Sequence, residues 1–76
     1  GSDREYIIKD ILDSQEHLLR LIEELLETQK ELLEILKRRP DSVERVRELV
    51  RRSKEIADEI RRQSDRNVRL LEEVSK

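Results

Sequence analysis

The sequence predicts an all-α protein, an antiparallel two-helix hairpin that assembles with further chains into a coiled-coil-like helical bundle. Leu, Ile and Val recur at heptad spacing along almost the whole chain, and a single proline divides the 76 residues into two segments of similar length. A chain of this length has room for one domain, residues 1–76, and its compact core is marginal without disulfides, metal or oligomerisation. There is no cysteine, so a disulfide framework is excluded.

The first helix is expected over residues 3–38. Ser2 and Glu5 have the spacing of a capping box. With Ile8 at heptad position a, apolar residues occupy four of the seven positions. They are Ile8, Ile22 and Leu36 at a; Ile11, Leu18, Leu25 and Leu32 at d; Leu12, Leu19, Leu26 and Leu33 at e; and Ile7, Leu21 and Ile35 at g.

The turn is expected at residues 39–41 and the second helix at 42–75. Pro40 disfavours helical geometry at Arg39 and lacks the amide that a continuing helix needs. Asp41 is the predicted N-cap, with Glu44 at capping-box spacing. With Val43 at position a, the second helix has apolar residues at a, d and g, but its e positions are mostly charged: Arg47, Lys54 and Arg61. A short connection between two long helices predicts an antiparallel hairpin.

The width of the apolar face on the first helix predicts association with another chain. Positions g, d, a and e together span about 160°, whereas a helix docked on one partner needs little more than ~100°. The remaining Leu and Ile would form an exposed patch larger than soluble monomers usually tolerate. The predicted interface consists of the a and d residues Ile8, Ile11, Leu18, Ile22, Leu25, Leu32 and Leu36.

Two polar pairs interrupt this face, Ser14-Gln15 and Thr28-Gln29, fourteen residues apart. In an antiparallel hairpin, Ser64 and Asn67 lie near the height of the first pair and Ser53 near the height of the second. Buried polar groups without partners cost about 1–3 kcal/mol, so their clustering predicts hydrogen-bond networks that select partner and register. The predicted network residues are Ser14, Gln15, Ser64, Asn67, Thr28, Gln29 and Ser53. The alternative for Ser and Thr is a bond to their own helix backbone, and Gln63 is either a network member or exposed.

Other function classes find little support, and we expect no enzyme activity, cofactor, metal or small-molecule substrate. His17 is the only histidine, and at position c it is either a solvated surface residue or a peripheral network member. Glu16 and Glu24 are interpreted as ordinary surface acids. Nucleic-acid binding is the alternative that the arginines of the second helix raise, but from Asp41 onward ten basic residues are interleaved with nine acidic ones. A membrane partner is not expected, because no Trp or Phe anchors accompany the apolar face.

Taken together, the chain resembles de novo designed helical-hairpin bundles with buried hydrogen-bond networks. The resemblance rests on the paired aliphatics, the two polar pairs, the Pro40-Asp41-Ser42 connection, the absence of Met, Trp, Phe and Cys, and Gly1-Ser2, which is typical of a scar left by tag removal. It implies a synthetic protein, soluble and cytoplasmic when expressed. It also implies a non-enzymatic oligomerisation module that forms a dimer or trimer of hairpins, or pairs with a cognate hairpin as half of a heterodimer. A dimer or a trimer, and parallel or antiparallel chains, all remain open.

Overall fold

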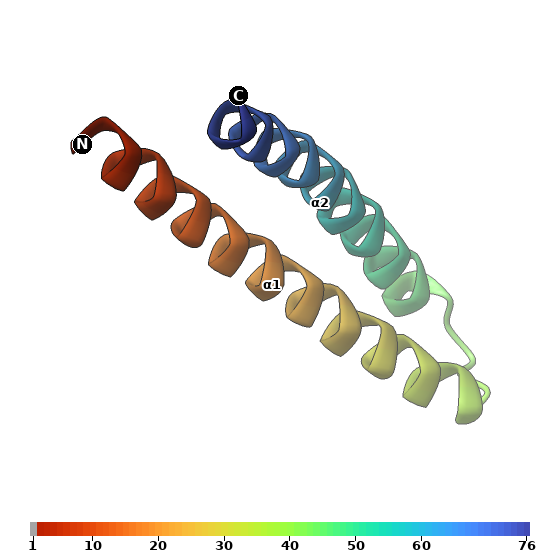
Figure 1. Ribbon diagram of the computed structural model, residues 1–76. Coiled ribbons are helices and arrows are strands. Elements are labelled where there is room, and N and C mark those ends of the chain that lie inside the picture. The colour runs from red at the N-terminus through yellow and green to blue at the C-terminus, as the bar shows by residue number, and fades with distance from the viewer. Residues whose placement is uncertain (1) are drawn as a thin grey trace.

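The chain folds as an all-α helical hairpin (Figure 1). The computed structural model describes residues 2–76, with side chains from Arg4 onward. Helix α1 spans Ser2–Lys37 and helix α2 spans Glu44–Ser75. The two helices run antiparallel, so that both ends of the chain lie at the same end of a rod measuring 61 × 14 × 13 Å. The predicted cap at Ser2 lies outside the described side chains.

Helix α1 ends at Lys37, and Arg39, just before the proline, has left-handed backbone geometry. The amide of Arg38 donates to the carbonyls of Glu34 and Ile35, at 3.3 and 3.1 Å, and the amide of Arg39 donates to Leu36 O at 3.2 Å. Arg39 itself has φ 50°, the conformation that commonly ends helices and that glycine adopts most easily. With Pro40 next, the chain leaves the helix at this point.

Helix α2 begins at Glu44, two residues later than the expected boundary, and the predicted Asp41 cap is wrong. Val43 occupies the N-cap position with φ −95° and ψ 0° and makes no side-chain capping bond. The first helical bond runs from Arg47 N to Val43 O, 2.9 Å. Ser42 takes over part of the capping task, since its hydroxyl accepts a bond from Glu44 N at 3.3 Å.

The two helices pack along their g and d positions, which we call the hairpin seam. Leu49 and Ile56 of α2 are its buried apolar residues, and Ser14 and Thr28 of α1 and Asn67 of α2 are its buried polar residues. The other seam residues are half-buried: Ile7, Ile11, Leu18, Leu21, Leu25, Leu32 and Ile35 on α1, and Val46, Ser53, Ile60, Gln63, Leu70 and Val74 on α2. Since each of these positions recurs every heptad, the contact runs along the length of both helices.

Candidate functional site

A second apolar stripe on α1 lies outside the hairpin seam. It occupies the a and e positions, whose spacing alternates between three and four residues as in a coiled-coil seam. Its apolar side chains are between 44% and 58% exposed. We call this stripe the open seam; it comprises Ile8, Leu12, Gln15, Leu19, Ile22, Leu26, Gln29, Leu33 and Leu36. A continuous exposed stripe of Leu and Ile is typical of a surface that binds another protein.

The structure divides the predicted interface between the two seams. The four d residues, Ile11, Leu18, Leu25 and Leu32, are half-buried in the hairpin seam. The three a residues, Ile8, Ile22 and Leu36, are exposed in the open seam. The e residues of α1 therefore belong with the a residues, and they had not been included in the predicted interface.

A groove between the helices borders the open seam. It has a volume of about 310 Å³ and is lined by Leu25, Gln29, Leu32, Val50, Ser53, Lys54 and Ala57. On the α2 side, the a residues Val43, Val50 and Leu71 are exposed, together with Val68 at an e position. The apolar surface thus extends from the open seam of α1 across the groove to α2.

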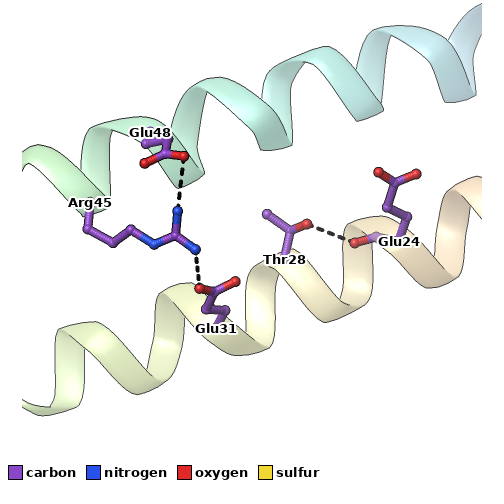
Figure 2. Close-up of polar contacts among 5 residues, drawn as sticks. All are labelled: Glu24, Thr28, Glu31, Arg45 and Glu48. Atoms are coloured by element: carbon purple, nitrogen blue, oxygen red, sulfur yellow. Dashed lines mark hydrogen bonds and ion pairs between the residues drawn. The ribbon is translucent and has the colours of Figure 1, made fainter.

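At one height of the hairpin, a polar side chain of the open seam reaches across to α2. Gln29 Nε2 donates to Ser53 Oγ at 2.9 Å, and Ser53 Oγ donates to Leu49 O at 2.8 Å. Thr28 does not join this chain of bonds: its hydroxyl donates to the Glu24 carbonyl in its own helix, 2.8 Å away (Figure 2). Thr28 therefore follows the local alternative, while Gln29 pairs with Ser53.

At the other polar height, side chains of α2 bond to a backbone atom of α1. Asn67 is only 3% exposed, and its Nδ2 donates to Ser14 O at 3.3 Å. Gln63 Nε2 donates to Asn67 Oδ1 at 2.9 Å and to Ser14 O at 3.5 Å. Gln63, which the sequence left undecided, thus takes part in this group. Within the described chain, Gln15 and Ser64 are half-buried and make no side-chain hydrogen bond.

The opposite flank of the hairpin seam carries charged pairs at the c positions. Arg52 pairs with Glu24. Arg45 pairs with Glu31 and, at 3.0 Å, with Glu48 (Figure 2). The hydrogen bond that Arg45 donates to Glu31, and then the one it donates to Glu48, raises the pKa of Arg45 above its ordinary value. Glu24 thus stays a surface acid and in addition forms an ion pair across the hairpin. The sequence signal was opposite charge at c positions in both helices, one heptad apart.

His17 lies in the same c row and is exposed. The pKa of Glu59 is held below its usual range, chiefly by the hydrogen bond from Arg62 and to a smaller extent by the charge of His17. The hydrogen bond with Glu59 correspondingly raises the pKa of Arg62. No hydrogen bond of His17 to the polar groups around Ser14 is present among the described residues. His17 therefore lies on the exposed flank of the hairpin, outside the polar group around Ser14.

The described residues contain no group of three or more His, Cys, Asp or Glu that could hold a metal ion. Within the residues that the structure describes, neither helix has a stretch long and apolar enough to cross a membrane. No protein-family model matches the chain, and no curated protein matches its sequence. The open seam, with its two glutamines and the adjoining groove, is the candidate functional site because its Leu and Ile side chains are exposed.

Proposed function

We propose that the chain is a non-enzymatic protein-interaction module that assembles with copies of itself through the open seam. The observation that carries this proposal is the row of half-exposed Leu and Ile along α1, interrupted by Gln15 and Gln29, which the hairpin's own second helix leaves uncovered. Such a row has the heptad spacing that another helix fits. The paired aliphatics stand at g with a and at d with e, so each pair places one residue in the hairpin seam and the other in the open seam.

The size of the seam is sufficient for association. Fully burying a Leu or Ile side chain stabilises by about 1.5–3 kcal/mol, and the seven apolar residues of the open seam are about half exposed. Covering them therefore contributes roughly 5–10 kcal/mol for each chain. Two chains gain this together and lose the translational and rotational freedom of one association, estimated at ~4–15 kcal/mol.

The two glutamines give the seam a preferred register. A glutamine amide has two donor hydrogens and an oxygen that accepts two bonds. Gln29 uses one donor for Ser53, and the Gln15 side chain makes no bond within the described chain. Burial against another chain is favourable only where the partner presents polar groups at the same heights, because an unpaired buried amide costs ~1–3 kcal/mol. A copy of this chain in matching register presents those groups.

A cognate hairpin with complementary polar residues is the alternative partner, since it could meet the free bonding groups of Gln15 equally well. Nucleic acid is a weaker alternative, because Arg45 and Arg52 are already paired with Glu31 and Glu24. Neither alternative accounts for the apolar row better than a second copy does.

Sedimentation equilibrium of the purified chain, with circular dichroism on the same samples, tests the proposal. A single dimeric or trimeric species that is fully helical is expected, and Ile22→Asp in the open seam should convert it to monomer. Arg20→Asp, on the opposite face of α1, is the matched control and should leave the assembly unchanged. A monomer at all concentrations would overturn self-association, and a polydisperse or poorly helical sample would favour a missing cognate hairpin.

A further inference from the structure

We propose that the copies are arranged around a rotational axis with their α1 helices parallel, so that α2 of each copy lies beside the open seam of the next. This inference rests on the proposed self-association and adds the geometry of the assembly. In this arrangement Glu16 and Glu23 of one copy face Arg61 and Lys54 of its neighbour. The occupant of the open seam is thus a second copy in one defined orientation.

The charges that border the open seam are left unused by the hairpin. On α1 the border is the b row, next to the e residues: Lys9, Glu16, Glu23, Lys30 and Lys37. On α2 the border is the e row, which contains Arg47, Lys54 and Arg61. All these side chains are exposed, and the ion pairs they form in the described chain are with near neighbours in their own helix, such as Lys30 with Glu27 and Arg61 with Asp58. They are therefore available to a partner.

The height of each charge follows from the ion pairs across the hairpin. Glu24 pairs with Arg52 and Glu31 pairs with Arg45. A residue seven positions later on α1 therefore lies level with a residue seven positions earlier on α2. Rotational symmetry places the neighbour's α2 at the same heights as the chain's own α2. Glu23 is then level with Lys54.

The same relation, continued one heptad towards the chain ends, places Glu16 level with Arg61. Towards the turn it places Lys30 level with Arg47, a like-charged pair. Lys30 is already paired with Glu27, at 3.6 Å, which reduces the repulsion at that height. Two of these contacts are therefore complementary, and the unfavourable one is partly neutralised.

An antiparallel arrangement of the α1 helices also aligns the polar residues, since Gln15 of one copy is level with Gln29 of the other. It makes the b rows of the two copies face each other, however. Lys9 then meets Lys37, and Glu23 meets the same residue of the other copy. Only Glu16 meets an opposite charge, on Lys30. The charge pattern therefore distinguishes two arrangements that the glutamines alone do not, and it favours the parallel one.

Charge reversal on each border, alone and together, tests the arrangement. Glu16→Lys/Glu23→Lys and Lys54→Glu/Arg61→Glu should each weaken self-association by about 10- to 100-fold, because two attractive contacts per interface become repulsive. The four substitutions together should restore association to within about threefold of the original chain, since each contact is again between opposite charges. Circular dichroism on every variant checks that the hairpin is folded.

Matched controls change the net charge equally on the face away from the seam. Asp10→Lys/Glu34→Lys corresponds to the first variant and Arg62→Glu/Arg69→Glu to the second. Both controls should associate like the original chain. If the controls weaken association as much as the border variants, or if the combined variant is not restored, the parallel arrangement is wrong.

Cross-linking gives an independent measurement, because the chain contains no cysteine. A disulfide requires Cα atoms within about 7 Å. In the parallel arrangement, Ile8→Cys should cross-link to the same residue of another copy on oxidation. A cross-link between Ile8→Cys and Leu36→Cys in a mixture would instead demonstrate antiparallel helices and overturn the proposal. Self-association itself fails only if the original chain is monomeric, so the two failures are distinguishable.

Discussion

Replacing Gln15 and Gln29 together with leucine should leave the hairpin folded and make its choice of partner less specific. Both residues occupy a positions in the open seam, where their neighbours are Leu and Ile. Gln29 is exposed in the hairpin and Gln15 is half-buried. Leucine at these positions would make the open seam apolar along its whole length, and every one-heptad shift between chains would then bury a similar surface.

The magnitude follows from the contacts of the two glutamines. Within the hairpin, the double substitution removes one hydrogen bond, from Gln29 to Ser53 at 2.9 Å, which costs about 0.5–1.5 kcal/mol. Ser53 keeps its bond to Leu49 O. In an assembly, two buried leucines contribute about 3–6 kcal/mol in place of the amides. The assembled state should therefore be about 1.5–5.5 kcal/mol more stable per chain, as an upper bound, since the glutamine stems already bury some surface.

Thermal melts followed by circular dichroism and oligomeric state measured by native mass spectrometry check this prediction. The double variant should keep its helicity, melt at the same temperature or higher, and populate more than one oligomeric state. Asn67→Leu, a polar-to-leucine change inside the hairpin seam, is the matched control and should keep the oligomeric state of the original chain. Unfolding of the double variant would show that the glutamines stabilise the fold. A single unchanged species would show that they do not select the partner.

Three further perturbations test the hairpin itself. Asn67→Ala should lower the free energy of unfolding by about 1–3 kcal/mol in denaturant titrations, because it removes the buried bonds to Ser14 O and Gln63. Arg39→Gly should raise the free energy of unfolding by up to ~1 kcal/mol. Glycine relieves the left-handed strain at this position, about 1–2 kcal/mol, and this outweighs the added entropy of the unfolded chain. An Arg39→Ala control should show no gain. The Glu59 pKa is lowered in the folded state, chiefly by Arg62, so its stabilising effect is present above the unfolded value of about 4.3 and is lost as the pH falls through the folded value. Glu59→Gln should therefore reduce the loss of helix stability measured between pH 6 and pH 3.

The fold class could be predicted from the sequence because a heptad repeat interrupted by one proline leaves few alternatives. The start of α2 was harder to predict. Asp41 and Glu44 have capping-box spacing, which predicts Asp41 as the N-cap. In the structure the turn that starts at Arg39 extends through Ser42, so Val43 is the N-cap instead. The hydroxyl of Ser42 is close enough to Glu44 N to serve in place of Asp41. Local competition between adjacent capping residues is not resolved by their spacing.

The candidate site was predictable in composition but not in its division between two surfaces. The apolar positions g, d, a and e lie next to one another around α1. They can form one central seam, made of d and a, or two separate seams, one made of g and d and the other of a and e. Apolar spacing fits both, and the predicted interface assumed the first. The structure has the second, with Glu24 and Glu31 paired to Arg52 and Arg45 along one edge of the g and d seam. The c-row charges distinguish the two choices, and recognising them requires comparing both helices at once.

The division of the seams explains why each polar interruption is a pair of residues. Ser14 and Thr28 are buried at g positions in the hairpin seam, whereas Gln15 and Gln29 stand one residue on, about 100° around the helix, in the open seam. Gln29 bonds back to Ser53 across the groove, so the polar residues at that height connect the hairpin seam to the open seam. A one-heptad slip of α2 would break that bond and would also move the charged border of α2 relative to α1. The register inside the hairpin and the proposed register between chains therefore depend on the same residues, and a change that shifts one should shift the other.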